Sequence, residues 1–330
     1  MRPPLVSVMI PTWRPDPEYL ETAVASVLAQ FEPGQAVQIE LVDDCSPDFD
    51  VSAFADRFGT GRPGSGRVSA RRNERRLGLV GNWNSCLEHA KHPWVHLLHQ
   101  DDFVLDGFYA ALQGGVGRTP QAALAFSASY FVDGDGLAWA PKLVAQDAPG
   151  ILEDWMQAVF ARLAIQCSAT LVRADAVRAL GGFDTALAYT PDWDLWQRLA
   201  VDFPIWFDPR PLAAFRQHSG SETSRQRASG AHVAEIFQCI ERFPARLGPE
   251  AVEPVSRTAR RHYAAFAVEE AWTVLPTPGG AGRAGGLLKL AWQRTSTLTL
   301  AAALCMCLAR ACVRPLVSRR RPLDLSRTAR

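Results

Sequence analysis

Two adjacent aspartates, Asp101 and Asp102, follow the apolar run at residues 94–98. Hard divalent cations such as Mg²⁺ and Mn²⁺ prefer carboxylate oxygens and often share their coordination shell with substrate phosphates. A metal held by this pair could neutralise the charge of a departing nucleotide diphosphate, acting as a Lewis acid on the leaving group. The alternative is that both residues only form a turn, because aspartate is a common turn residue.

Three further aspartates stand where a carboxylate could act on a substrate. Asp43 and Asp44 follow the apolar run at residues 37–42, and ionised carboxylates there could accept hydrogen bonds from a nucleotide base or ribose. The same residues also suit a plain turn. Asp192 stands at the start of a helical pattern. It could cap that helix or, if an acceptor hydroxyl comes within reach, serve as a general base.

Arg216 and His218 follow a strand-like run at residues 212–216. At a strand end, such a pair could contact phosphates or a metal ion, although a surface loop fits the spacing equally well. Trp193, next to Asp192, could stack on a sugar ring or pack in the core. Residue type and spacing alone therefore leave both interpretations of these side chains open.

The elements that would position these residues alternate between strands and helices. Apolar runs predict buried strands at 6–10, 37–42 and 94–98, and helical spacing predicts helices at 17–31 and 80–90. Such alternation indicates an α/β fold with a mostly parallel sheet, in which ligands bind beyond the carboxyl ends of the strands. Polar pairs fall at three of these ends: Pro11 with Thr12, Asp43 with Asp44, and Asp101 with Asp102.

The second half of the chain predicts shorter elements and then a helical region. Strands are expected at 166–173, 204–207 and 212–216, and helices at 174–180 and 192–201. From about residue 229 the pattern is helical and carries fewer motifs.

Several segments, in order, resemble family 2 glycosyltransferases of the GT-A fold. The resemblance covers roughly residues 5 to 220. Its segments are 6–13, 25–30, 40–46, 99–102, 181–184 and 191–199. The resemblance implies a Rossmann-like, mixed and mostly parallel sheet flanked by helices, with a C-terminal helical extension.

The resemblance also implies roles for individual residues. Asp192 would be the general base that deprotonates an acceptor hydroxyl for in-line attack, with inversion at the anomeric carbon. Asp102 would bind Mn²⁺ or Mg²⁺, with His218 as an extra ligand, and Arg216 would contact phosphate. The nucleotide-sugar donor would be bound by Pro11, Thr12, Asp43, Asp44 and Asp101. The acceptor side would be formed by Gly182, Phe183, Asp184 and Trp193.

Some positions depart from the family pattern. Pro191 precedes the base where an acid is usual, and Gln100 stands where many members carry an acid. The Gln-x-x-Arg-Trp signature of processive synthases is absent, so transfer of one sugar at a time is expected. Two alternatives remain: a catalytically silent protein that binds sugar nucleotides at a membrane, and a sugar nucleotidyltransferase. The second would need a glycine-rich phosphate loop after the first strand, and residues 11–15 contain no glycine.

The net charge of +1 conceals a division of the chain. Residues 281–330 contain ten Lys or Arg and one acid, a net charge of +9 that leaves −8 for the remainder. An acidic body argues against nucleic-acid binding. We expect a GT-A domain at 1–225, a helical extension at 226–280 and a basic, apolar tail at 281–330.

The apolar part of the tail, residues 295–309, is too short for a confident membrane span. Its basic flanks suit a helix on an anionic membrane surface, and the alternative is a terminal helix docked on the body. A lipid-linked or saccharide acceptor would fit the first arrangement. The seven cysteines show no paired spacing, and no signal segment opens the chain. We therefore expect a cytoplasmic protein, peripheral on the inner face of the membrane.

Overall fold

The structure is a computed structural model that describes residues 5–32, 35–58, 68–133, 137–141, 143–295 and 321–322. Its strands are β1 (Val6–Thr12), β2 (Gln38–Asp43), β3 (Val68–Arg72), β4 (Trp94–Leu97), β5 (Phe103–Val104), β6 (Leu124–Val132), β7 (Leu137–Trp139), β8 (Gly150–Ile151), β9 (Thr170–Arg173), β10 (Ile205–Arg216) and β11 (Arg321–Pro322). Within these residues, they form one eleven-stranded sheet in the order β11-β7-β6-β9-β4-β1-β2-β3, with β10 joined to β5, β6 and β8.

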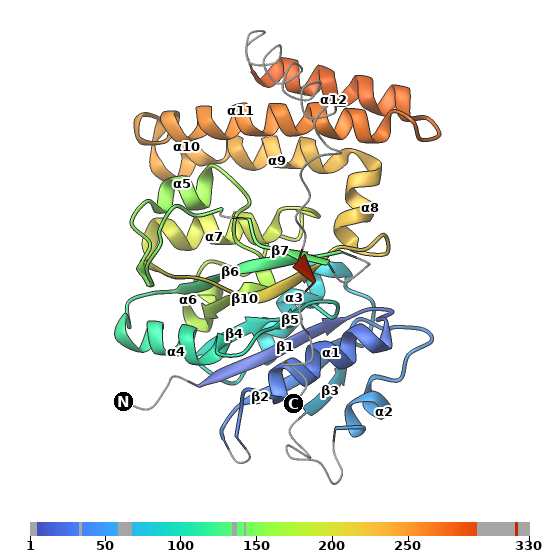
Figure 1. Cartoon of the computed structure of the whole chain (residues 1–330), viewed down its shortest axis with the longest axis vertical. Helices are drawn as coiled ribbons and strands as arrows, with labels where there is room; N and C mark the ends of the chain where they lie inside the picture. Colours follow the sequence, from blue (N-terminus) through green and yellow to red (C-terminus); the bar gives the residue numbers. More distant parts are fainter. Residues whose placement is uncertain are drawn as a thin grey trace.

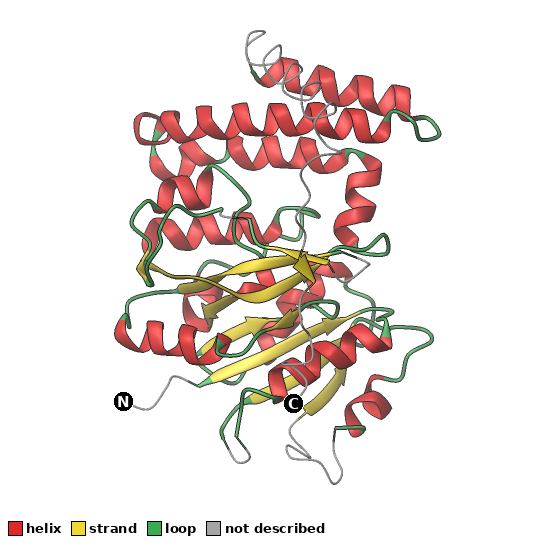
Figure 2. Cartoon of the chain, viewed as in Figure 1, coloured by secondary structure: helices red, strands yellow, loops and turns green. Residues whose placement is uncertain are grey.

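Helices surround this sheet and form a further layer beyond it (Figures 1 and 2). They are α1 (Pro17–Leu28), α2 (Val51–Asp56), α3 (Gly78–His89), α4 (Phe108–Arg118), α5 (Trp155–Phe160), α6 (Ala174–Ala179), α7 (Pro191–Asp202), α8 (Glu222–Ser229), α9 (Ala231–Glu241), α10 (Phe243–Leu247), α11 (Pro249–Val274) and α12 (Gly280–Arg294), with the 3₁₀ turn η1 (Cys167–Ala169). The elements thus give a mixed sheet with helices on its faces, and the expected α/β fold is confirmed.

Strand β1 lies inside the sheet, and all seven of its residues are buried. It pairs in parallel with β2 on one side and with β4 on the other. A continuous apolar run is typical of such a strand because both of its faces are covered. Val8 and Ile10 pack in the same core cluster as α1 and α4, whereas Met9 packs with α3 and α7. This alternation follows from the two-residue period of a strand.

Helix α1 begins where the sequence predicts it. The Asp16 carboxylate accepts hydrogen bonds from the backbone N–H groups of Glu18 and Tyr19, and Pro17 occupies the first helical position. An aspartate cap followed by proline is a strong helix start, because the carboxylate accepts hydrogen bonds from open N–H groups of the first turn and proline has no N–H group to be satisfied. The helix ends at Leu28, three residues before the expected end.

Three of the expected strands differ from the structure. Residues 204–207 and 212–216 belong to the single strand β10, whose register against β6 shifts around Pro211. Proline lacks the N–H group of a ladder hydrogen bond, so the pairing is interrupted while the strand continues. Residues 166–173 divide into η1 and the short strand β9.

Strand β10 brings the end of the sheet domain back to the first acidic pair. It runs antiparallel to β5, with Ala214 opposite Phe103. Because Phe103 directly follows Asp102, the residues that follow β10 arrive beside both aspartates. This pairing joins positions more than one hundred residues apart in the chain.

A helical layer lies on the α7 side of the sheet (Figure 1). Helices α9, α11 and α12 stack beyond α5 and α7, and Ala284, Leu287 and Ala291 of α12 are buried in the same core cluster as α11. Residues 281–294 of the expected tail therefore belong to a helix docked on the body. Residues 296–309 of the apolar segment and the basic residues at 319–320 lie outside the described residues.

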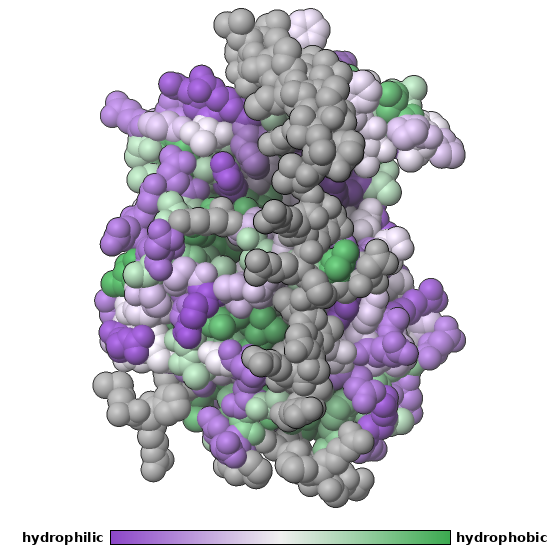
Figure 3. Space-filling view, in the orientation of Figure 1, coloured by the Kyte–Doolittle hydropathy of each residue, from purple (hydrophilic) through white to green (hydrophobic). Residues whose placement is uncertain are grey.

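Large apolar side chains are exposed at the outer helices: Trp272 and Leu275 at the end of α11, and Trp292 on α12. On the face drawn in Figure 3, hydrophobic residues form separate patches among hydrophilic ones. No helix among the described residues combines the length and the apolar character that crossing a bilayer requires.

Candidate active site

The loops after β1 and β2 contain the two non-glycine residues with positive φ among those described. These are Arg14, with φ of 45°, and Cys45, with φ of 59°. A hydrogen bond of 2.7 Å from the Arg14 N–H to the Ser46 hydroxyl joins the two loops. Left-handed backbone is unfavourable for such residues and clusters at functional sites. The strain therefore marks the carboxyl edge of the sheet as the place for a ligand.

Asp43 and Asp44 lie at this edge, and both are buried with protein partners. Asp43 accepts hydrogen bonds from the Ser46 N–H at 3.0 Å and from the Thr12 hydroxyl at 3.4 Å, and it pairs with Arg72 at 3.2 Å. The carboxylates thus organise the loops of the site, and little of their acceptor capacity remains for a nucleotide. Their expected contact with the donor stays a prediction, as does that of Pro11, which is buried at the end of β1.

Asp44 also determines how α3 begins. Its carboxylate accepts hydrogen bonds from the N–H groups of Leu77 at 2.7 Å and Gly78 at 2.8 Å, and from the Asn73 amide at 3.1 Å. Leu77 at the N-cap position offers no side-chain cap of its own. A carboxylate at the positive end of the helix dipole satisfies the open N–H groups. Helix α3 is therefore capped by the end of β2.

Asp101 and Asp102 face different partners although they are adjacent. Asp101 Oδ2 lies 2.8 Å from His218 Nε2. Asp102 is almost completely buried, and its carboxylate accepts hydrogen bonds from the Ser168 hydroxyl at 2.5 Å and from the Arg216 N–H at 2.9 Å. The structure thus gathers Asp101, Asp102, Arg216 and His218, as the sequence predicts, at the ends of β4 and β10.

His99 completes a group of side chains that could hold a metal. Ligand atoms of His99, Asp101 and Asp102 all lie within 4.8 Å of one another. His99 Nε2 makes no hydrogen bond to a described residue, and its ring stacks on Trp83 with centroids 4.9 Å apart. The residues fit a divalent cation because they combine carboxylate oxygens with an imidazole. His218 is not one of these three residues, but it lies next to Asp101.

The pKa values of the three side chains in this group shift in different directions. Burial raises the pKa of both carboxyls, but in Asp101 the hydrogen bond from His218 and the nearby histidine charges outweigh burial and hold the pKa below its usual value. In Asp102 the effect of burial prevails and the pKa is raised. Burial lowers the pKa of His99, yet its pairing with Asp102 outweighs that effect and leaves the pKa well above its usual value. Such divergent pKa values are typical of functional sites.

Arg216 is held firmly but keeps donors free. Its guanidinium lies 4.2 Å above the Tyr19 ring and 5.4 Å from that of Phe103, and its Nε donates to the Asp101 carbonyl at 2.9 Å. Its two terminal nitrogens make no hydrogen bond to any residue that the structure describes. A planar guanidinium with free donors beside a metal group is suited to phosphate.

Asp192 lies in the first turn of α7 and has the electrostatics of a base. Its carboxylate accepts only a hydrogen bond of 2.8 Å from the Trp193 N–H among the described residues. Burial raises the pKa of Asp192 to about 6, against the nearby positive charge of His99. A carboxyl with a pKa close to neutral accepts a proton far more readily than an ordinary aspartate. Asp192 therefore combines access, proximity to His99 and basicity.

The residues expected on the acceptor side form a turn between α6 and α7. Gly182 has φ of 74°, and a Cβ there would lie 2.6 Å from the Asn84 side-chain oxygen. Asn84 exchanges hydrogen bonds of 2.9 Å with the backbone of the buried Phe183. Asp184 pairs with Arg242 at 2.9 Å. These contacts fix the turn to α3 and to the helical layer, and its acceptor role stays a prediction.

Trp193 packs in the core of the protein. It is 2% exposed, its indole N–H donates to the Val159 carbonyl at 2.5 Å, and it packs on Phe243 and Tyr263. The proposed contact with a sugar ring is therefore wrong, because the helical layer covers this side chain. The neighbouring Asp192 lies on a different face of α7.

A cluster of arginines around Trp13 is a feature that motif spacing misses. Arg76 lies 3.9 Å from the centroid of the Trp13 ring, Arg14 at 5.2 Å and Arg225 at 5.7 Å. Arg14 and Arg76 make no ion pair with the described residues. Gln100 fixes Trp13 through hydrogen bonds to its N–H and carbonyl at 2.9 and 3.3 Å. Like charges gathered on one ring suit an anionic ligand.

Ser168 is a second site residue absent from the sequence predictions. It sits in η1 and donates to Asp102, and its hydroxyl accepts from the His99 N–H at 3.2 Å. A serine in a short turn carries no signal in the sequence, because its partners lie 66 and 69 positions away.

Comparison with known proteins identifies the family and the fold of the chain. The model of glycosyl transferase family 2 matches residues 7–173, about half of the chain. The uncharacterized protein MT1568 of Mycobacterium tuberculosis (strain CDC 1551 / Oshkosh) is 29% identical over 292 residues, or 82% of this chain and 83% of that protein.

Two solved structures are similar in fold. TarS 1-349 of S. aureus in complex with UDP-GlcNAc has a TM-score of 0.68 and 14% identity, covering 89% of this chain and 82% of that one. The mannosyltransferase PcManGT of Pyrobaculum calidifontis, in complex with GDP-Man and Mn²⁺, has a TM-score of 0.62 and 16% identity. The match covers 96% of this chain and 82% of that one. The family match and the shared GT-A fold lead to one conclusion: the chain belongs to glycosyl transferase family 2 and is a glycosyltransferase.

Proposed function

We propose that this glycosyltransferase moves one sugar from a nucleotide-sugar donor to a saccharide or lipid-linked acceptor, with inversion at the anomeric carbon. One observation carries the proposal: Asp192, with its raised pKa, interacts electrostatically with His99, which forms a group with Asp101 and Asp102. A base on one side and a charge-binding group on the other are what single displacement at a sugar carbon needs.

The acidic group would hold a divalent cation, Mn²⁺ or Mg²⁺. Asp101, Asp102 and His99 offer the ligand atoms, and His218 lies next to Asp101. The likeness to PcManGT, whose complex contains Mn²⁺ with GDP-Man, supports a cation of this kind. When bound, it would supply neutralising charge for the diphosphate leaving group.

The donor would lie along the ends of β1, β2 and β4. The free nitrogens of Arg216 and the arginines at Trp13 would contact its diphosphate, and Thr12 lies at the same edge. The nucleotide-sugar complex of the similar TarS structure supports this class of donor. Pro11, Asp43 and Asp44 would form the wall of the nucleoside site, with Asp43 and Asp44 chiefly holding its loops in place.

The acceptor would approach Asp192 from the opposite side. The ionised carboxylate would take the proton of the acceptor hydroxyl as its oxygen attacks the anomeric carbon and the bond to the diphosphate breaks. A cavity of about 230 Å³ between β6, β10 and residues 140–141 and 143–147 is lined by Leu143, Gln166 and Phe207 among others. It adjoins η1 through Gln166 and is our candidate for the acceptor region.

The test is the variant Asp192→Asn, with Asp202→Asn as control. Asp202 is exposed at the far end of the same helix. Asp192→Asn should lose transfer to a sugar acceptor while nucleotide diphosphates still raise its melting temperature with Mn²⁺ as in the wild type. Normal turnover of this variant with a genuine acceptor would show that the base is another residue.

One observation favours a second candidate, a silent protein that binds sugar nucleotides. Pro191 occupies the position before the base, where an acid is usual in the family. Such a protein would bind the donor without consuming it. Mn²⁺-dependent release of nucleotide diphosphate from the donor, lost upon chelation, would rule this candidate out.

We also propose that the outer helices place the enzyme on an anionic membrane surface at the cytoplasmic face. Trp292 is 64% exposed on α12, and the exposed Lys289 lies one turn before it. An aromatic ring beside a cation suits the membrane interface, and the basic residues up to 330 would add attraction. We expect the protein to sediment with anionic vesicles but not with neutral ones. Failure to sediment with anionic vesicles would contradict the placement.

A further inference from the structure

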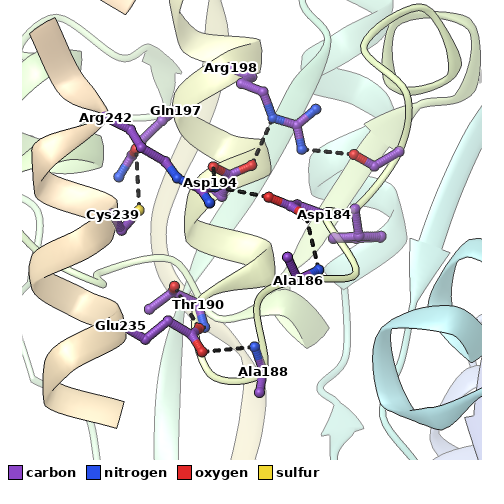
Figure 4. A network of polar contacts seen from close by, with 12 residues as sticks. Asp184, Ala186, Ala188, Thr190, Asp194, Gln197, Arg198, Glu235, Cys239 and Arg242 are labelled. Carbon is purple, nitrogen blue, oxygen red and sulfur yellow. Dashed lines mark hydrogen bonds and ion pairs between the residues drawn. The ribbon is translucent and has the colours of Figure 1, made fainter. Parts of the chain in front are cut away.

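A carboxylate from the helical layer holds the loop that leads into α7. Glu235, on α9, accepts hydrogen bonds from the N–H groups of Ala188 at 2.8 Å, Tyr189 at 2.7 Å and Thr190 at 2.6 Å. The Thr190 hydroxyl donates to the same carboxylate at 2.9 Å. Figure 4 shows the side chain reaching from α9 towards Ala188 and Thr190. One carboxylate thus collects four donors from three consecutive residues.

These contacts hold the loop up to the N-cap residue Thr190, and none of them reaches an N–H group within α7. Thr190 stands at the N-cap position of α7 but makes no side-chain cap, and the next residue, Pro191, has no N–H to be capped. The loop before the helix therefore offers its N–H groups to Glu235. Within the described residues Glu235 makes no ion pair, so its charge is balanced by these donors and by the positive end of the α7 dipole.

Other residues on the same face of α9 contact the same region. Arg242 pairs with Asp184 at 2.9 Å and with Asp194 at 3.1 Å, and the ring of His232 lies 5.1 Å from that of Tyr189. Positions 232, 235, 239 and 242 are spaced by three and four residues, which places them on one side of a helix. Figure 4 shows Arg242 directed at Asp184 and Asp194. Helix α9 therefore fixes both ends of the turn that precedes the base.

We propose that Glu235 is a positioning residue, which holds residues 188–190 so that Asp192, two residues later, meets the acceptor hydroxyl in a productive geometry. The inference rests on the proposed function of Asp192. It assigns the helical layer, which lies outside the part of the chain that the family model matches, a direct share in building the active site. Glu235 touches no reacting atom in this arrangement.

The charge of Glu235 suits this role better than a neutral side chain would. A carboxylate offers four lone-pair positions, whereas the amide of glutamine offers two and directs its NH₂ group towards backbone N–H donors. Glu235→Gln keeps the shape of the side chain but leaves donors of the loop unpaired. The loop then loses its fixed geometry while the core of α9, formed by Val233, Ile236 and Ile240, stays unchanged.

The experiment compares Glu235→Gln with Glu241→Gln in the full chain. Glu241 is on the same helix and pairs only with Arg294 at the surface among the described residues, so the control removes the same charge. We expect kcat of Glu235→Gln to fall by roughly 10- to 100-fold, because a misplacement of about 1 Å can cost that much. The KM for the donor should stay within about twofold, since the donor edge is untouched. Because a smaller folded fraction would also lower the apparent kcat at unchanged KM, rates are normalised to the folded protein, which circular dichroism measures in each variant.

A second variant and a second measurement keep the proposal open to refutation. Thr190→Val removes one of the four donors and should lower kcat by only a few-fold. Backbone hydrogen exchange of residues 188–190 should be faster in Glu235→Gln than in Glu241→Gln. Wild-type kcat in Glu235→Gln, or unchanged exchange at these amides, would overturn the proposal. An inactive wild type with faster exchange in the variant would instead refute the proposed function.

Discussion

Two helices that begin at the proposed active site, α3 and α7, are each preceded by a segment that a carboxylate from another element holds. Asp44 caps α3 from the end of β2, through bonds to Leu77 and Gly78. Glu235 plays the corresponding part for the loop before α7, from a helix 45 residues further along the chain than Thr190. Asp44 lies within a recognisable motif, whereas Glu235 lies in a segment without one.

This difference separates two sides of the proposed active site, one for the donor and one for the base. The donor side is built from strand ends of one sheet, whose pairing brings Thr12 opposite Asp43 by register alone. The base side depends on how α7 docks against α9, through Glu235 and Arg242. A sheet edge is fixed by the ladder that forms it, whereas helix docking depends on side chains that must meet across a packed surface.

The largest effect is expected on the donor side from Asp101→Asn, with the exposed Asp106→Asn as control. Loss of the carboxylate removes a metal ligand and the partner of His218, so turnover should fall by about 100-fold or more and need more Mn²⁺. Titration of turnover with Mn²⁺ measures both changes. If Asp101→Asn behaved like Asp106→Asn, the donor side would not be organised around this carboxylate.

The next effect concerns the base side and its pH dependence. Protonated Asp192 cannot accept a proton, and burial raises its pKa to about 6. Transfer should therefore fall about tenfold for each pH unit below about 6 and level off above it. Rates measured at saturating donor from pH 4.5 to 8 test this. A rate that stays constant down to pH 5 would show that Asp192 is not the titrating group.

A smaller effect is expected where the donor meets the arginines. Arg76→Ala removes the guanidinium closest to Trp13, and the adjacent exposed Arg75→Ala is the control. Affinity for a nucleotide diphosphate should weaken by roughly 3- to 10-fold, and the effect should shrink at high salt because exposed charges are screened. Calorimetric titration at two salt concentrations measures it. Equal affinities of the two variants would remove the cluster from the donor site.

The smallest effect is on stability and again separates the two sides. An aspartate whose folded pKa lies above its unfolded value of about 4 binds its proton more tightly when folded. The fold therefore loses stability as pH rises from about 4 to about 6, and the loss persists above. Asp192→Asn should remove this loss of stability. We expect its free energy of unfolding to rise by about 1 kcal/mol and its melting temperature by about 2–4 °C at pH 7.5. Asp202→Asn should show neither change; a melting temperature lowered in Asp192→Asn would contradict the raised pKa.

Much of the proposed donor side was predictable, because strand ends are marked by residues that are neighbours in the sequence. Apolar runs ended by polar residues placed the ends of β1, β2 and β4 within one or two residues of the structure. The acids follow directly from these ends, since parallel strands present their carboxyl ends at one edge. The role of Trp193 was not predictable, because the helices that bury it carry no motif.

The sequence alone determined where the acids stand along the chain and which strands carry them, because periodicity and turn residues act over a few positions. Tertiary structure decided which of those acids remain available. Asp44 is used to cap α3 and Asp194 pairs with arginines of the helical layer, whereas Asp101 and Asp192 face the site. The partners that consume or spare a carboxylate come from segments tens of residues away. Only the packed fold brings them together, and burial there sets the pKa of the base.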